Sequence, residues 1–145
     1  MDDDRVAQLF EFADLVLAVG RQLRAVQERS ADTCTPVESM VMRAITRHPG
    51  VSARDAARAT NLPSSNFSRH LRGLEQRGLV RREVSPHDAR TVQLFPTERA
   101  RSDLDDLARI WAEALSSSAM DVASVEALNN ALQLIDERLR SVESQ

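Results

Sequence analysis

Apolar residues recur at steps of three and four along the first part of the chain, which is the spacing of one face of an α-helix. This stripe predicts a long helix over residues 5 to 28 and consists of Val6, Leu9, Phe10, Ala13, Val16, Leu17, Gly20 and Leu23. A second stripe follows Asp121 with the alternating steps of a heptad seam, which is typical of a helix that pairs with another helix. Its members are Val125, Leu128, Leu132, Ile135, Leu139 and Val142.

Between these stripes, a strong start signal for a helix stands at residues 35–38, Thr-Pro-Val-Glu. It offers a capping hydroxyl, a proline at the first helical position and a carboxylate three residues after the cap. The predicted helix ends before Pro49-Gly50. Its expected inward residues are Val37, Met40, Val41, Ala44 and Ile45.

Two further helices are predicted to be joined by a tight turn. Ser52 opens a short helix that runs into Thr60-Asn61, where asparagine can adopt the left-handed conformation. Residues 62–64, Leu-Pro-Ser, open the next helix, and Gly78 stands where a glycine ends a helix. The inward stripe of this second helix consists of Phe67, His70, Leu71 and Leu74.

The residues after Gly78 favour a β-hairpin with a charged tip. Residues 79–84 and 91–95 are rich in apolar and β-branched side chains, and the polar segment 85–90 separates them. Pro96-Thr97 then opens a helix with the inward stripe Leu104, Leu107, Ala108, Trp111, Ala114 and Leu115.

Helix, tight turn, helix and charged hairpin within residues 52 to 95 are the order of a winged helix-turn-helix, in a mainly α chain with a small β-hairpin wing. We expect an N-terminal dimerisation helix over 1–34, a DNA-binding domain over 35–96 and C-terminal dimerisation helices over 97–145. The terminal stripes are wider than a small winged domain can cover, and uncovered apolar faces mark association. An intramolecular bundle of the same helices is the competing interpretation.

The charge along the chain is uneven, with a basic middle between acidic flanks. Residues 43 to 101 hold twelve arginines and five acidic residues, a local charge of +7 in a chain whose formal charge is −3. The flanks carry −4 over residues 1 to 42 and −6 over residues 102 to 145. Because phosphate binding follows the local field, which salt screens within about 8 to 10 Å, the negative total does not exclude DNA binding.

The second helix of the pair is the candidate reader of DNA, because that helix lies in the major groove in this motif. With Phe67, Leu71 and Leu74 inward, its outward face over residues 63 to 72 holds hydroxyls, an amide and arginines but no acid. The candidate DNA-binding residues are Ser64, Ser65, Asn66, Ser68, Arg69 and Arg72. Arg69 is the first choice for guanine, since a guanidinium fork matches the O6 and N7 acceptors. Arg72 is expected at the DNA backbone, and His70 is expected to be packed rather than to read bases. For any single residue, the alternative is an ordinary solvated position.

The hairpin adds Arg81, Arg82 and Arg90 to the positive charge. Arg90 at the tip is the candidate for a narrow minor groove, where the potential is most negative. Asp88 would repel phosphate unless it had an internal partner, which could be Arg82. A turn-forming Asp88 that bonds to its own backbone is an equal alternative.

Several classes of function are excluded or disfavoured by residue content. Cys34 is the sole cysteine, so no internal disulfide or thiolate metal cluster can form. Asp32 and Glu38 raise the pKa of its thiol rather than lower it, which argues against an oxidation sensor there. No stretch is apolar enough to span a membrane, and the acidic start Met-Asp-Asp-Asp is wrong for a secretory signal, so we expect a cytoplasmic protein.

Catalysis is disfavoured on geometry. Ser65, His70 and Asp88 supply the residue types of a triad, but Ser65 and His70 lie on opposite faces of one helix. No glycine-rich loop, nucleophile elbow or metal-ligand cluster is present, so no catalytic residue, metal or cofactor is expected.

These motifs together resemble the MarR family of bacterial winged-helix regulators. The resemblance is carried by Ala56-Ala57, the run Leu-Glu-Gln-Arg-Gly-Leu-Val at 74–80, Asp88-Ala89-Arg90 in the wing, and Thr97-Glu98. It implies an obligate homodimer on a pseudo-palindromic operator, released by a small, often phenolic, ligand or by an oxidant. It also implies that Arg82 and Asp88 brace the wing while Arg90 meets the minor groove. Pro96 and Ala100-Arg101 depart from the family pattern, where leucine and glycine are common.

The sequence therefore predicts a sequence-specific double-stranded DNA-binding regulator, expected to be a repressor. The competing prediction is a winged module that binds protein without reading DNA sequence, because folds do not fix functions. A ligand pocket is expected where the dimer helices meet the winged unit, with Met40, Arg43 and Trp111 as candidate walls. Met and Trp at helical spacing are more often core residues, so these three are not assigned to a site.

Overall fold

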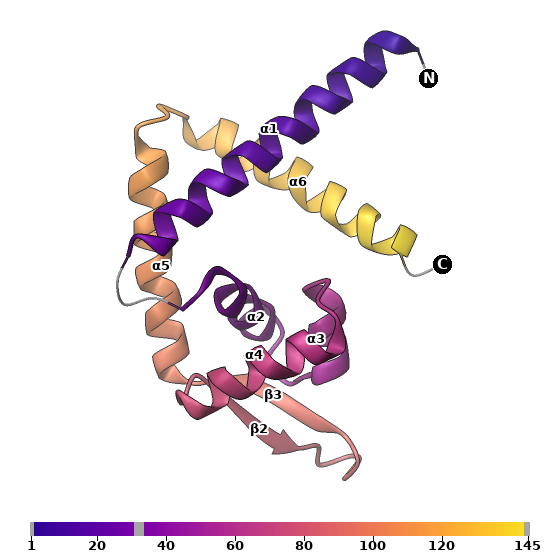
Figure 1. Ribbon diagram of the computed structural model, residues 1–145, viewed down its shortest axis with the longest axis vertical. Coiled ribbons are helices and arrows are strands. Elements are labelled where there is room, and N and C mark those ends of the chain that lie inside the picture. The colour runs from indigo at the N-terminus through magenta and orange to yellow at the C-terminus, as the bar shows by residue number, and fades with distance from the viewer. Residues whose placement is uncertain (1, 31–33, 144–145) are drawn as a thin grey trace. The chain divides into compact units, whose positions relative to one another are not determined.

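The computed structural model describes residues 2–30 and 34–143 of the chain. Within them the elements are α1 (Asp3–Glu28), α2 (Pro36–Arg47), β1 (Val51–Ser52), α3 (Ala53–Ala59), α4 (Ser64–Gln76), β2 (Val80–Val84), β3 (Val92–Pro96), α5 (Glu98–Ser116) and α6 (Val122–Glu143) (Figure 1). The chain divides into two compact units, residues 1–114 and 115–145, and each is described by itself. The predicted fold class, a mainly helical winged helix-turn-helix, is confirmed.

The core of the first unit lies among α2, α3, α4 and the small sheet. It is almost entirely aliphatic, with one phenylalanine, and its fully buried residues include Val41, Ile45, Ala56, Phe67, Leu71, Leu74, Leu79 and Leu94. Removing these side chains from water is the main favourable term for the fold. It also fixes which face of α4 remains outside.

The first turn of α2 forms the predicted capping box. The Glu38 N–H donates to Thr35 Oγ1 over 3.3 Å, and the Thr35 N–H donates to Glu38 Oε2 over 3.0 Å. The predicted inward stripe is correct for Val41 and Ile45, but Met42 is buried and Met40 only partly so. The reason is that α2 is enclosed on more than one side, by α1 as well as by α3 and α4.

The turn between α3 and α4 has the geometry that the sequence predicts. Ser52 caps α3 by accepting from the Asp55 N–H over 3.1 Å. Asn61 adopts a positive φ of 51°, the left-handed conformation that asparagine tolerates in a tight turn. At the other end of α4, Gly78 has a φ of 70° and turns the chain into β2.

The sheet is antiparallel, with the strand order β1-β3-β2. The hairpin β2–β3 is the predicted wing, and Val80 pairs with Pro96 at its base and Val84 with Val92 near its tip. The sequence did not predict β1, because two residues are too few for a period-two pattern. Its pairing with β3 is anchored by the Gly50 N–H, which donates to the Leu94 carbonyl over 2.8 Å.

The start of α5 is tied to the end of α4. The Thr97 hydroxyl accepts from the Ala100 N–H over 3.2 Å and donates to the Gly78 carbonyl over 2.8 Å. Ala100 is fully buried at the position where the resemblance departs from the family pattern. Farther along, the Trp111 indole N–H donates to the Leu23 carbonyl of α1 over 3.2 Å. These bonds fix α5 within the first unit.

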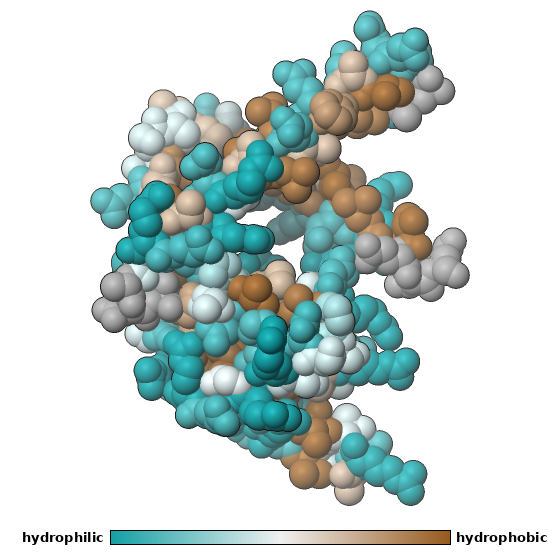
Figure 2. All heavy atoms as spheres, in the orientation of Figure 1, coloured by the Kyte–Doolittle hydropathy of each residue, from teal (hydrophilic) through white to brown (hydrophobic). Residues whose placement is uncertain are grey.

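Helix α6 of the second unit and helix α1 of the first unit each expose many large apolar side chains. On α1 these are Val6, Leu9, Phe10, Phe12, Leu15, Val16, Leu17 and Val19, and on α6 they are Val122, Val125, Leu128, Leu132, Leu134, Ile135, Leu139 and Val142. Figure 2 shows hydrophobic side chains at the surface of each helix. In the described part of the chain, no helix has the length and apolar character needed to cross a membrane.

Candidate nucleic-acid interface

The outer face of α4 is the centre of the candidate interface. Phe67, Leu71 and Leu74 are buried, so the opposite face of the helix points outward. The six predicted DNA-contact residues of this helix are all exposed: Ser64, Ser65, Asn66, Ser68, Arg69 and Arg72. The structure therefore agrees with the predicted orientation of the helix, while DNA contact by each residue stays a prediction. His70 is half-buried on the flank of the core.

The N-terminal end of α4 is electrostatically open to an anion. Pro63 occupies the cap position without a side-chain capping bond, and no acid stands in the first turn. Helix N-termini present unpaired N–H groups and a partial positive charge. The acid-free outer face of residues 64–72 therefore extends to the N-terminus of the helix.

The wing tip is organised by Asp88. Its carboxylate accepts from the Arg90 backbone N–H and from the Thr91 hydroxyl, each over 2.9 Å. The Arg90 N–H, followed by the Thr91 hydroxyl, lowers the pKa of the Asp88 carboxyl from its ordinary value. The turn therefore fixes the backbone at Arg90, whose side chain is exposed.

The suggested pairing of Arg82 with Asp88 is wrong. Arg82 lies in the body of β2 beside the end of α4, and its guanidinium binds both carboxylate oxygens of Glu75. Asp88 is engaged in its own turn, as the alternative interpretation has it. Both residues contribute to the wing structure, Arg82 by joining β2 to α4 and Asp88 by closing the tip.

Arg81 is less available than its exposure suggests. Its guanidinium lies 4.9 Å from the centre of the Phe95 ring and forms an ion pair with Glu83. A stacked and paired arginine contributes little net charge to a distant phosphate. Within the hairpin, Arg90 is therefore better placed than Arg81 for DNA.

The C-terminal end of α4 is held on its inner side by α2 and α5. Arg77 Nη1 lies 3.0 Å from Glu38 Oε2, so Glu38 both caps α2 and holds α4. Arg99 Nη1 donates to the Arg77 carbonyl over 3.2 Å. These contacts keep the outer face of α4 in one orientation relative to the wing.

A cavity of about 220 Å³ lies between α1, α2 and α5, and the three residues named as candidate walls, Met40, Arg43 and Trp111, all line it. The Arg43 guanidinium lies 4.9 Å from the Trp111 ring centre, and its Nη1 is buried without a hydrogen-bond partner among the described residues. Burial, followed by repulsion from Arg47, lowers the pKa of Arg43. An unpartnered buried cation beside an aromatic ring is suited to an anionic ligand.

Cys34 is buried, with 3% of its surface exposed. Burial raises the pKa of the thiol, and Arg77 only partly offsets that rise. A shielded, protonated thiol is poorly reactive. In the described residues, no group of three or more His, Cys, Asp or Glu side chains gathers at one point where a metal could bind.

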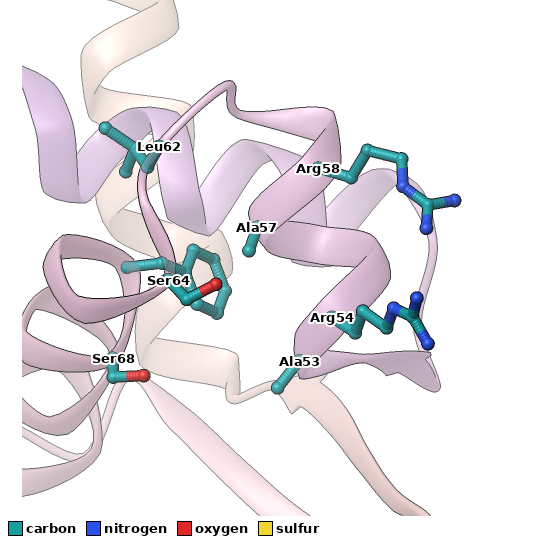
Figure 3. A pocket seen from close by; sticks show the side chains of 8 residues that line it. Ala53, Arg54, Ala57, Arg58, Leu62, Ser64 and Ser68 are labelled. Atoms are coloured by element: carbon teal, nitrogen blue, oxygen red, sulfur yellow. The ribbon is translucent and has the colours of Figure 1, made fainter. Parts of the chain in front are cut away.

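Two arginines of α3 were not singled out from the sequence. Arg54 and Arg58 are both exposed and border a hollow between α3 and the first turns of α4 (Figure 3). Their i, i+4 spacing on a short helix was the available signal, since residues four apart lie on one face.

Comparisons of the sequence and of the structure with known proteins both find members of the MarR family. The sequence model of the MarR family matches residues 34–91, from the end of the α1–α2 connection to the tip of the wing, and stops before β3. No curated protein sequence matches the chain.

Solved structures match most of the chain. A MarR-family regulator of Rhodococcus sp. RHA1 is 26% identical, with 87% of this chain and 92% of that chain covered and a TM-score of 0.71. CouR of Rhodococcus jostii RHA1, solved with p-coumaroyl-CoA bound, is 25% identical, with 86% and 91% covered and a TM-score of 0.70. FabT of Streptococcus pneumoniae, solved in complex with DNA, shares the fold at 18% identity, with 97% and 99% covered and a TM-score of 0.63. The chain therefore has the fold of MarR-family regulators, and its residues 34–91 are similar in sequence to that family.

Proposed function

We propose that this protein is a sequence-specific double-stranded DNA-binding transcriptional regulator, acting as a repressor on a pseudo-palindromic operator in the cytoplasm. The observation that carries the proposal is the outer face of α4 over residues 64–72, which exposes hydroxyls, an amide and two arginines but no acid. Ordinary surface helices mix both signs of charge. An acid-free face on the second helix of a helix-turn-helix favours contact with a polyanion.

The proposed contacts fall into two classes. Arg69, near the middle of the outer face, reads guanine through its bidentate fork, while Ser65 and Asn66 approach base edges or phosphates. Arg72, farther along the helix, and Arg90, at the wing tip, contact the backbone and the minor groove. Contacts to base edges specify the sequence, whereas contacts to phosphates set position and affinity.

A homodimer is supported by the apolar faces of α1 and α6. Such faces favour burial against a second copy, because large exposed apolar patches are rare on monomers. This assigns dimerisation to residues 1–34 and 97–145 and DNA binding to residues 35–96. Two recognition helices about 34 Å apart, one turn of DNA, then match a two-fold symmetric operator.

Release by a small anionic effector is supported by the cavity beside Arg43 and Trp111. Arg43 and Trp111 both line the cavity, so a guanidinium lies beside it for a carboxylate and an aromatic ring for an apolar group. CouR, one of the similar proteins, binds a coenzyme A thioester of an aromatic acid. The buried Cys34 gives no comparable support for release by an oxidant.

Arg69→Ala and Arg90→Ala test the function, because the first is expected to lose discrimination between duplexes and the second to lose affinity for any duplex. Arg69→Ala reduces the ratio of affinities for the operator and an unrelated duplex by about 5-fold or more, because a bidentate base contact contributes about 1 to 3 kcal/mol. Arg90→Ala weakens binding to both duplexes more evenly. Arg109→Ala is the control, since Arg109 is exposed on α5 and paired locally with Asp106. Equal affinity of wild type and both variants for every duplex contradicts the proposal.

A winged module that binds protein is the second candidate function, supported by the same exposed helix faces. The salt dependence of binding separates the two. For DNA binding, the logarithm of the binding constant falls linearly with the logarithm of the salt concentration, with a slope of about −0.9 for each neutralised phosphate. Binding to a protein partner with no salt-dependent binding to DNA favours the second candidate.

A further inference from the structure

Gln27, near the C-terminal end of α1, is the residue of that helix most deeply enclosed by the protein. Its exposed fraction is 2%. Among the α1 residues, all of which lie in the described part of the chain, it is the only buried one. An amide removed from water is costly unless it is hydrogen-bonded, so this position requires partners of fixed geometry.

The Gln27 amide is hydrogen-bonded to the start of α2. Its Nε2 donates to the Cys34 carbonyl over 2.9 Å and to the Ser39 hydroxyl over 2.6 Å. Ser39 is itself buried, with 2% of its surface exposed. The bond to Ser39 crosses from the proposed dimerisation segment, residues 1–34, into the proposed DNA-binding domain, residues 35–96.

A second hydrogen bond to α1 joins different parts of the chain. The Trp111 indole N–H donates to the Leu23 carbonyl, one turn before Gln27. Trp111 belongs to α5, which the proposed function assigns to dimerisation, so this bond joins two dimerisation segments. The bond from Gln27 to Ser39, by contrast, joins α1 to the DNA-binding domain.

The two bonds of Gln27 restrain the orientation of α1 more strictly than apolar contacts do. Apolar contacts are non-directional and tolerate small displacements, whereas a hydrogen bond weakens steeply as its angle bends. A turn or tilt of α1 would leave a buried amide without these partners, which is unfavourable. A buried polar residue fixes the register of paired helices in the same way.

A small change of angle at Gln27 has a large effect at a distance. Helix α1 has 26 residues and is therefore about 39 Å long. Its large exposed apolar side chains, from Val6 to Val19, all lie N-terminal to Gln27. A tilt of about 5° at Gln27 moves the far end of the helix by about 3.4 Å, which equals the rise of one base pair.

We infer that Gln27 is a positioning residue that holds the DNA-binding domain at a fixed angle to the dimerisation helix and thereby sets the spacing of the two half-sites, an inference that rests on the proposed function. Gln27 is buried, so it acts through α2 and touches no DNA. In a dimer this joint occurs twice, and the displacements at the two joints add. With both joints fixed, the two recognition helices accept one half-site spacing.

The tolerance of Gln27→Met for an altered half-site spacing tests this inference. Methionine is similarly long and unbranched but cannot donate the two hydrogen bonds. One probe is a duplex selected from a random pool by the wild-type protein, and the other is the same duplex with one base pair inserted between its half-sites. The spacing ratio is the affinity for the first duplex divided by the affinity for the second.

Wild type is expected to have a spacing ratio of about 10 or more, because the insertion displaces one half-site by about 3.4 Å and turns it by about 35°. Gln27→Met is expected to lower the ratio about 5-fold or more, which is the effect of one typical hydrogen bond on an equilibrium constant. Partial unfolding reduces binding to both duplexes alike and leaves the ratio unchanged. A merely structural role of Gln27 therefore does not alter it.

Gln22→Met is the matched control, since it makes the same change at an exposed position of α1 and should keep the wild-type ratio. Ser39→Ala removes one acceptor of the Gln27 amide and provides a second test if Gln27→Met folds poorly. It is expected to lower the spacing ratio by a smaller factor. Sedimentation at the same concentration is expected to give all variants the wild-type mass.

If wild type discriminates between the duplexes and both Gln27→Met and Ser39→Ala keep its ratio, the inference is overturned while the proposed function stands. A wild-type ratio near one also overturns it, because no spacing is then fixed. An equal fall of the ratio in Gln22→Met, or a loss of mass in Gln27→Met, assigns the effect to assembly and contradicts the role of Gln27. If wild type selects no motif with two half-sites, the proposed function itself fails.

Discussion

At the scale of single residues, three buried side chains orient α4, and the ion pair of Arg82 with Glu75 joins this helix to β2. The inward positions of Phe67, Leu71 and Leu74 follow from helical periodicity, and the structure buries all three. The partner of Arg82 does not follow from any local pattern, because Glu75 reaches it only once α4 and β2 pack together. Helical periodicity shows which face of an element is buried, whereas a contact between two elements depends on how they pack together.

Thr91→Val tests the organisation of the wing tip. The Thr91 hydroxyl and the Arg90 N–H lower the folded-state pKa of Asp88, so loss of the hydroxyl is expected to raise that pKa. A carboxyl whose pKa is lowered in the folded protein stabilises the turn at pH values above its ordinary pKa of 3.8. This stabilisation is lost as the pH falls through the folded-state pKa. NMR titration of the Asp88 carboxyl carbon measures the shift. An identical titration midpoint in wild type and variant contradicts the geometry.

Cys34 is expected to react slowly with a thiol reagent in the folded protein. Its burial excludes the reagent and raises the pKa of the thiol, so little thiolate is present near pH 7. The absorbance released by a chromogenic disulfide measures the rate, with the urea-unfolded chain as the fast reference. Equal rates in the folded and unfolded protein contradict the prediction.

At the scale of elements, start and stop signals predicted the helices well. The capping box at Thr35, the left-handed Asn61 and the terminal Gly78 all stand where local chemistry requires them. The strand β1 could not be predicted, since two residues have no periodicity and exist as a strand only through pairing with β3. Local bonding is visible in a sequence, and pairing between distant segments is not.

Gly73→Ala is expected to stabilise the protein by about 1 kcal/mol, because alanine is the better helix former. An added Cβ would lie 3.6 Å from Glu38 Oε1, which is ordinary contact, so space permits the change. Urea unfolding at fixed protein concentration measures it. Gly78→Ala is the matched control and should destabilise the protein by about 1 kcal/mol, since its φ is 70°. A loss of stability in Gly73→Ala contradicts the helix packing described for α4.

Glu38 is expected to make two separable contributions where α2 meets α4. Glu38→Gln keeps an oxygen for the Thr35 N–H but loses the ion pair with Arg77, at a cost of about 0.5 to 1 kcal/mol. Glu38→Ala loses both, at a further cost of about 1 kcal/mol. Urea midpoints of the two variants separate the contributions. Equal stability of the two variants shows that the cap contributes nothing.

At the scale of the whole molecule, the exposed apolar faces of α1 and α6 are the feature that a single chain leaves unexplained. The heptad spacing of residues 125 to 142 indicated a pairing helix from the sequence alone. The identity of the partner is not encoded in the periodicity, because a second copy and another helix of the same chain present the same chemistry.

Leu128→Asp/Leu132→Asp is expected to convert a dimer into single chains. Burial of each leucine contributes about 1.5 to 3 kcal/mol and four leucines are lost in a symmetric dimer, so dimerisation weakens at least about 10,000-fold. Sedimentation equilibrium at micromolar concentration measures the mass. Asn130→Asp on the same helix is the control and keeps the mass of two chains. A wild-type mass of one chain supports the intramolecular bundle instead.

Sequencing of the genomic fragments retained by the purified protein tests the central claim most directly. One enriched motif is expected, and its two halves are inverted copies centred about 10 to 10.5 base pairs apart, as two recognition helices of a symmetric dimer require. Retained fragments with no common motif, or a motif without two-fold symmetry, would contradict it.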